Sequence, residues 1–317
     1  MARTQHQPTS ADHPPLSNGL GVSMAVLTLV QWSAVPLFLH HFARTIDLWT
    51  SNGWRYGFAA ILWLPVAIVA LRSSRLSKRD VAAVLVPAML WFLGQTAFGG
   101  AHYFVQPGMV TFAVRVQILF VLVGSLFLVP GTAAALRRSE SWIGATLLIA
   151  GTVGVAALGP DALSGGDWFG IALAMGGGGL LGLYAVSVQV IKTDLSSLAR
   201  FSLVIQAVGA GMLALMITLG DRAGLGVAAF GIEGWILLGI SAIVGIAAGH
   251  ITYFVAIRNS GVVIASGTAQ LQPFLVLTAS AFLFDEVFTV PQLAAGIISV
   301  VGAVMLVRSL SKHRSAG

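Results

Sequence analysis

Residues 168–191 read "WFGIALAMGGGGLLGLYAVSVQVI", a run of apolar and small residues without a single charged side chain. A helix needs about 20 such residues to cross the hydrocarbon core of a membrane. Backbone N–H and C=O groups find no partners in lipid, and this run lacks the polar–apolar alternation of a membrane β-strand. The run therefore predicts one transmembrane helix.

The rest of the chain repeats this pattern. Of the 317 residues, 57% are hydrophobic and 9% are charged, whereas about a quarter of the residues in soluble domains are charged. The composition argues against a soluble enzyme and predicts an all-α, polytopic membrane protein. Basic clusters, prolines and polar residues divide the chain into ten predicted helices near residues 20–40, 52–71, 81–104, 107–129, 141–159, 166–191, 197–219, 233–256, 259–284 and 289–308.

Basic residues lie in short clusters between the apolar runs, although the sequence pI is near 10.3. Such clusters mark cytoplasmic loops and do not indicate a nucleic-acid partner. We expect both termini in the cytoplasm and the chain in a cell membrane, such as the bacterial inner membrane. On this topology thirteen of the 17 Lys and Arg residues are cytoplasmic: Arg3, Arg72, Arg75, Lys78, Arg79, Arg137, Arg138, Lys192, Arg200, Arg258, Arg308, Lys312 and Arg314.

Short segments recur in the same order in the two halves of the chain, at offsets of 145 to 151 residues. They predict a duplicated unit of five helices, and because five is odd the two copies are inverted in the membrane. Inverted repeats meet at a central substrate path, as in secondary transporters. The matching segments are "WRYGF" (54–58) with "ARFSL" (199–203), "HYFV" (102–105) with "TYFV" (252–255), and "GATLLIAG" (144–151) with "AGIISVVG" (295–302). The expected domains are a flexible tail (1–18), a first repeat (19–160), a second repeat (161–309) and a second tail (310–317).

The segment "SGVVIASGTAQLQPFLVLTASAFLFDEVFTVPQLAAGIISVVGAVMLV" (260–307) resembles the last two helices of EamA-type transporters of the drug/metabolite transporter superfamily. The first half departs from the pattern, since it has no proline matching Pro273 and has "VPG" (129–131) in place of the acidic end. The resemblance implies a ten-helix carrier of small metabolites, often an exporter, that works by alternating access without ATP. The matching residues are Pro273, Asp285, Glu286, Gly296 and Gly302.

Arg115 stands among apolar neighbours in "TFAVRVQILF" (111–120), inside the fourth predicted helix. Eight residues beyond Pro107 place it about 12 Å deep, close to the middle of a core about 30 Å thick. A charge at this depth must face protein or water, because lipid cannot solvate it. We interpret Arg115 as the counter-ion of a carboxylate or phosphate on a solute. A structural role, capping carbonyls or reaching the interface, is the alternative.

No Asp or Glu falls in the middle of a predicted helix, so the path suits anions or zwitterions better than lipophilic cations. A coupled proton would need a histidine, either His102 or His250. Pro273 is expected to break the ninth helix and free a carbonyl one turn earlier. Gln117 and Gln272, two positions beyond Arg115 and Gln270, are each expected to point away from that neighbour, so the four cannot all face the path. The expected substrate-binding residues, each of which also fits plain helix packing, are Arg115, Gln270, His250, Tyr253, Gln95, Trp91, His102, Gln31, Trp32 and Tyr184.

Other polar and glycine-rich features are expected to be structural. Asp285 and Glu286 read as a solvated helix end, and Arg55 and Arg200 as anchors at the membrane interface. The glycines at 176–179 favour close helix packing or a hinge, because the Lys and Ser/Thr of a phosphate loop are missing. The chain has no cysteine, and its histidines and acids lack metal-ligand spacing, so no cofactor, metal site or catalytic residue is expected.

The sequence therefore predicts a secondary transporter for a small anionic or zwitterionic solute, such as an amino acid or organic acid, with export as the expected direction. Its expected partners are that solute and the lipid bilayer. A membrane-embedded enzyme acting on a lipid or lipid-linked substrate is an alternative, as is a passive channel. The substrate, the direction of net flux, the coupling and the oligomeric state, a homodimer included, stay open.

Overall fold

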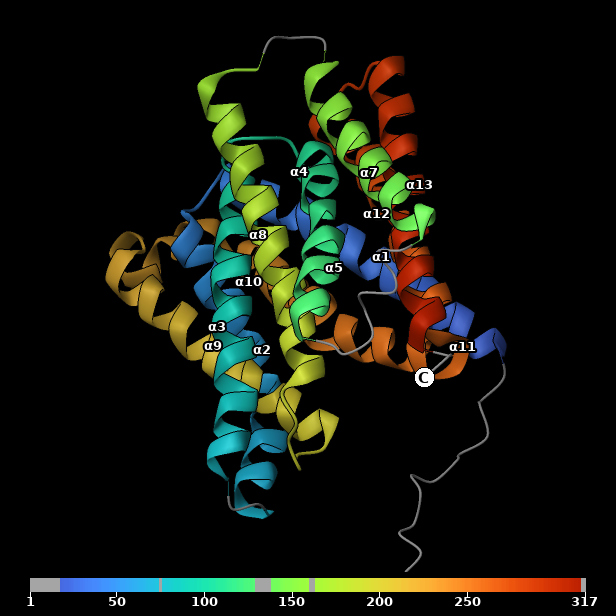
Figure 1. Ribbon diagram of the computed structural model, residues 1–317. Coiled ribbons are helices and arrows are strands. Elements are labelled where there is room, and N and C mark those ends of the chain that lie inside the picture. The colour runs from blue at the N-terminus through green and yellow to red at the C-terminus, as the bar shows by residue number, and fades with distance from the viewer. Residues whose placement is uncertain (1–17, 74–75, 129–137, 160–162, 315–317) are drawn as a thin grey trace, which may run out of the picture.

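The computed structural model describes residues 18–73, 76–128, 138–159 and 163–314, all in helices or connecting turns, without a strand (Figure 1). Ten helical stretches in these residues are long and apolar enough to cross a membrane. The predicted fold class and number of spans are therefore confirmed. The "VPG" segment, and the expected tails up to residue 17 and from 315, lie outside the described residues.

Six spans are single helices that differ from the predicted ranges by a few residues. The third and sixth spans begin with capping boxes, in which Ser77 pairs with Asp80 and Ser164 with Asp167. The six are α1 (Asn18–Ala43), α2 (Leu48–Ser73), α3 (Lys78–Ala101), α7 (Ser139–Ala157), α8 (Gly165–Val190) and α9 (Ser197–Leu219). A seventh, α13 (Val290–Arg314), continues into the first residues of the predicted C-terminal tail.

The remaining three spans are interrupted. The fourth consists of α4 (Pro107–Ala113), the short 3-10 helix η1 (Val114–Val116) and α5 (Gln117–Leu128). The eighth and ninth share one helical stretch, which turns at Gly261, where φ is +82°. Their elements are η2 (Asp221–Phe230), α10 (Gly231–Ala242), the π-helical η3 (Ile243–Ala248), α11 (Gly249–Ala269) and α12 (Gln272–Phe284).

Helices of the first half pack mainly against helices of the second half. The main pairs are α7 with α13, α3 with α8, α1 with α11 and α2 with α9. Figure 1 shows α7 in green beside α13 in red. A Cβ at Gly144 would lie 3.0 Å from the Gly302 carbonyl oxygen, and one at Gly151 would lie 2.6 Å from the Ala295 oxygen. The glycine segments that the sequence matched to each other therefore form an antiparallel contact of backbone on backbone.

The glycine run of α8 serves close packing on two sides. A Cβ at Gly177 would lie 2.9 Å from the Gly94 carbonyl oxygen of α3, and one at Gly178 would lie 2.5 Å from the Val114 oxygen of η1. The helix continues through the run, so close packing, not a hinge, is what the structure shows.

One of the three sequence matches between the halves joins unlike structures. Residues 102–105 follow the end of α3 in a turn, whereas residues 252–255 lie within α11. The similarity of "HYFV" and "TYFV" therefore gives no support to the repeat.

Candidate functional site

A cavity of about 490 Å³ lies among helices from both halves of the chain, a volume typical of small-molecule sites. Its wall is mostly apolar and aromatic, with a few polar groups. Among the described residues that line it, none is Asp or Glu. The polar and aromatic lining residues are Trp32, Arg55, Tyr56, Trp91, Gln95, Phe98, Arg115, Gln117, Tyr184, His250, Tyr253, Phe254, Ser266, Gln270 and Gln272.

The fourth and ninth spans both lose regular α-helix geometry at this cavity. Arg115 is the central residue of η1, between α4 and α5. The ninth span breaks at Gln270 and Leu271, and Pro273 lies in the first turn of α12. Proline cannot donate to the carbonyl one turn earlier, which belongs to Ala269, and Ala269 lines the cavity. Irregular backbone in a membrane is tolerated only where it is buried in protein or lines a cavity.

Arg115 joins the two broken spans. Its side chain is 8% exposed; Nη1 donates to Gln270 Oε1 at 3.2 Å, and Nη2 donates to Gln272 Oε1. Its Nε has no hydrogen-bond partner among the described residues. The two glutamine oxygens accept hydrogen bonds but carry no charge, so the charge of the guanidinium is not neutralised by these partners.

The two glutamines are held in turn by backbone groups. Gln272 Nε2 donates to the Trp32 carbonyl at 2.7 Å, and Gln270 Nε2 donates to the Ser266 carbonyl at 3.3 Å. The hydroxyls of Ser266 and Tyr253 lie 2.8 Å apart. This network fixes the orientation in which the amide oxygens meet Arg115.

The expectation that Arg115, Gln117, Gln270 and Gln272 cannot all face the path is wrong, since all four line the cavity. It assumed a regular rotation of 100° per residue, which places positions two apart on different faces. The break at residues 270–271 and the 3-10 turn before Gln117 change that rotation. Gln272 therefore meets the same guanidinium as Gln270.

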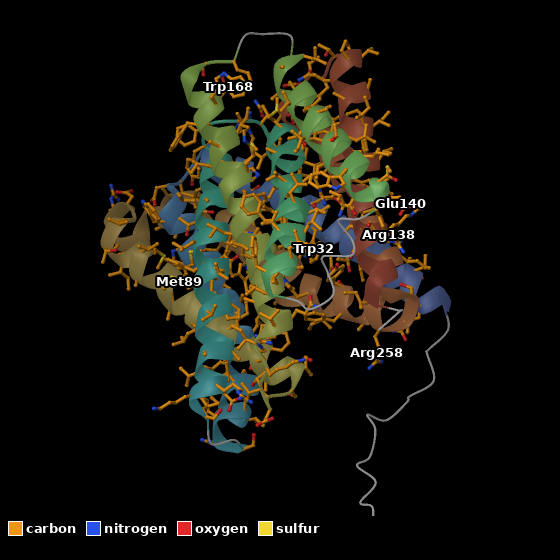
Figure 2. All side chains as sticks on the ribbon, viewed as in Figure 1. Trp32, Met89, Arg138, Glu140, Trp168 and Arg258 are labelled. Carbon is orange, nitrogen blue, oxygen red and sulfur yellow. The ribbon has the colours of Figure 1, made fainter. Side chains whose placement is uncertain are left out.

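Aromatic rings form one wall of the cavity. The Trp91 ring lies 4.9 Å from the His250 ring and 5.1 Å from the Tyr184 ring, measured between centroids. Trp32, which Figure 2 labels in the middle of the bundle, lies 4.9 Å from the Tyr253 ring. These rings come from helices of both halves and provide flat apolar surface for an organic solute.

Most of the predicted substrate-binding residues meet at this cavity, but two do not. His102 is buried outside the lining, where its Nδ1 lies 2.9 Å from the Phe98 carbonyl oxygen. Gln31 accepts a hydrogen bond from Thr252 at 2.6 Å. The eight that line the cavity are Arg115, Gln270, His250, Tyr253, Gln95, Trp91, Trp32 and Tyr184.

Arg55 and Arg200 are not exposed anchors, which corrects that interpretation. Arg55 is 1% exposed and lines the cavity. Arg200 is 9% exposed and donates to the carbonyls of Ala83 at 2.9 Å and Val188 at 2.6 Å. The predicted start of the second helix, at residue 52, placed Arg55 near a helix end. Because α2 begins at Leu48, Arg55 lies about 10 Å from the start of the helix.

Glu286 is not solvated, in contrast to Asp285, which is exposed. The Glu286 carboxylate accepts hydrogen bonds from the backbone N–H groups of Gly108 at 3.0 Å and Met109 at 3.4 Å. Burial raises the pKa of Glu286, and these hydrogen bonds oppose part of the shift. Glu286 therefore ties the loop after α12 to the start of α4.

Comparison with known proteins agrees with this architecture. Residues 168–308, which include the sixth to tenth spans, match the model of the EamA-like transporter family. No curated protein matches the sequence. A solved structure titled only "Crystal structure of protein" has a TM-score of 0.60 and 13% identity, over 95% of this chain and 99% of that one. At that identity the likeness shows the fold alone.

The ten apolar spans indicate a polytopic membrane protein. The match of residues 168–308 to the EamA-like transporter family, together with the ten spans, agrees with the EamA-type resemblance seen in the sequence. This family points to a drug/metabolite transporter that acts on small molecules at a membrane, and it supports a transporter over an enzyme.

Proposed function

We propose that this chain is a secondary transporter that exports a small anionic or zwitterionic solute, such as an amino acid or organic acid. The observation that carries the proposal is Arg115: a buried guanidinium at a break in a membrane span, facing a cavity and hydrogen-bonded to neutral amides. A carboxylate or phosphate is the natural complement, because it neutralises the charge and fits the guanidinium with two parallel hydrogen bonds.

The proposed mechanism is alternating access between two inverted repeats, residues 19–160 and 161–309. Pairing of α2 with α9 and of α7 with α13, at corresponding places in the two halves, supports such a relation. So does the meeting of the broken fourth and ninth spans at Arg115. In transporters built from inverted repeats, discontinuous helices at the repeat interface bind the solute, and one repeat moves against the other.

The proposed location is a cell membrane, such as the bacterial inner membrane, with both termini in the cytoplasm. The bias of Lys and Arg toward one set of loops supports this orientation.

The test is counterflow into proteoliposomes that hold a mixed pool of amino acids and organic acids. Wild type is compared with Arg115→Gln and with Arg72→Gln, which changes an exposed arginine near the end of α2. We expect saturable exchange of an acidic or zwitterionic solute by wild type and Arg72→Gln, and its loss in folded Arg115→Gln. Neutral and cationic solutes serve as controls.

Other results would contradict the proposal in recognisable ways. Exchange of cations alone, or full activity of Arg115→Gln, would remove the counter-ion role. Flux without saturation or counterflow would indicate a channel, and a covalently altered lipid or solute would indicate an enzyme.

A further inference from the structure

Arg55 is a second buried guanidinium on the wall of the same cavity. It belongs to α2, whereas Arg115 belongs to η1. Its Nε donates to Ser241 Oγ at 2.8 Å, and Ser241 Oγ donates to the Leu238 carbonyl at 3.0 Å. Its Nη1 has no hydrogen-bond partner among the described residues. The hydrogen bonds found for this guanidinium therefore leave a buried donor unused.

Arg200 has the hydrogen bonds expected of an arginine whose role is to hold helices together. Arg200 is the residue that the sequence match between the halves aligns with Arg55. All three of its guanidinium nitrogens donate to backbone carbonyls, those of Ala83, Val188 and Ser187. Arg200 is absent from the cavity lining, whereas Arg55 is part of it. Arg55 thus has one hydroxyl partner where Arg200 has three carbonyls.

Arg55 and Arg115 bring two positive charges to the cavity wall, and no described lining residue carries a negative charge to balance them. Both guanidinium groups are buried, and the partners found for them are a hydroxyl and two amides. The lining residues that the structure describes include no carboxylate. Burying a charge without an opposite charge is costly. An occupant with two negative charges would complete the balance, and one with a single charge would leave one guanidinium uncompensated.

We propose that Arg55 forms a second anion subsite, so that the transported solute carries two negative charges, one for each arginine. This inference rests on the proposed transport function and narrows its solute class. A dicarboxylate, an acidic amino acid and a singly esterified phosphate have the required chemistry. A monocarboxylate and a neutral amino acid lack the second charge.

The test compares probes that differ in one charge and little else. Succinate is compared with succinamate, and glutamate with glutamine, and methyl phosphate is tested as a single-group dianion. Binding to the purified full-length protein is followed by tryptophan fluorescence, because Trp32 and Trp91 line the cavity. The variants are Arg55→Gln, Arg55→Lys and Arg115→Gln, with Arg72→Gln as the exposed control on the same helix.

We expect wild type and Arg72→Gln to bind the dicarboxylate of each pair roughly tenfold or more tightly than its amide partner. Arg55→Gln should bring the two dissociation constants together, and Arg55→Lys should restore part of the preference because it keeps the charge. Tighter binding of methyl phosphate than of either dicarboxylate would also support the requirement for two charges. It would indicate that the solute carries both charges on one phosphate group. The wild-type ratio needs no variant, so it tests the two-charge requirement even if Arg55→Gln fails to fold.

Two outcomes would overturn the inference, and they differ in what they leave standing. Equal binding of the charged and amide probes, lost only in Arg115→Gln, would remove the Arg55 subsite and leave the proposed function intact. Binding of none of these probes, together with counterflow of cations alone, would remove both.

Discussion

Glu286 caps the first turn of α4 from the other half of the chain: its Oε2 lies 3.0 Å from the Gly108 nitrogen and its Oε1 lies 3.4 Å from the Met109 nitrogen. The N-cap residue of α4, Gln106, makes no such bond with its own side chain. The first N–H groups of a helix have no partner within the helix, so Glu286 supplies what the local sequence lacks.

Replacing Glu286 should therefore destabilise the protein. We expect Glu286→Ala to lower the free energy of unfolding by about 1–2 kcal/mol, the usual cost of a lost cap. Asp285→Asn is the matched control, since Asp285 is exposed and its left-handed backbone (φ 55°) suits asparagine. Thermal melting in detergent measures both. Equal melting temperatures for the two variants would contradict the capping role.

The same contact gives a pH dependence whose sign can be worked out. Burial raises the pKa of Glu286 above its value in the unfolded chain, so the folded state holds the extra proton over the interval between the two values. Stability from this group is therefore greatest below the unfolded pKa and is lost as the pH rises through the folded pKa. We expect the melting temperature of the wild type to fall as the pH rises over that interval, and to fall less in Glu286→Gln. A wild-type profile that Glu286→Gln reproduces would contradict this assignment.

The glycine run of α8 offers a comparison within a few residues. At Gly178 an added Cβ would lie 2.5 Å from the Val114 oxygen, whereas at Gly176 it would meet nothing within 4 Å. We expect Gly178→Ala to destabilise the protein by about 1–3 kcal/mol through overpacking and to reduce transport, because it presses on the turn that carries Arg115. Gly176→Ala should be neutral or stabilising by about 0.5–1 kcal/mol, since alanine favours helix. Similar melting temperatures for the two would show that α8 and η1 are not tightly packed.

A substitution at Gln270 can neutralise the charge of Arg115 with a carboxylate from the chain itself. We expect Gln270→Glu to place a carboxylate 3.2 Å from Nη1, where it competes with an anionic solute. The solute found by counterflow should then bind roughly tenfold or more weakly, while the melting temperature stays equal or rises. Dissociation constants and melts on the same preparation separate the two effects. Unchanged affinity would mean that the solute does not use this side of Arg115.

Much of the membrane architecture follows from apolar length alone. Ten spans, and a break at Pro273, come from residue types whose effects are local: long charge-free runs and a proline without an N–H. The predicted start of the second helix, at residue 52, is too late. The Asp47 carboxylate accepts hydrogen bonds from the N–H and the hydroxyl of Thr50, so α2 begins at Leu48 and Arg55 lies about two turns inside it.

Placement around the cavity is harder to predict, because it depends on helix rotation. Trp91 and Gln95 share a face because α3 is regular there. His102 does not join that face, since α3 ends at Ala101 and the His102 ring lies against the Phe98 carbonyl. Gln117 and Gln272 follow interruptions that change the rotation. The role of Glu286 depends on a partner 178 residues earlier, which no local pattern marks.

The hydrogen bonds of Arg115 also bear on how the protein is made. The amide oxygens that meet its guanidinium lie 155 and 157 residues later in the chain. The ribosome thus completes the whole first half before either glutamine is synthesised. The fourth span therefore enters the membrane before Arg115 can form these hydrogen bonds. A fragment ending near residue 160 would keep that arginine among apolar neighbours. The two halves of this protein therefore cannot mature independently: the fourth span reaches its final state only after the ninth has been inserted.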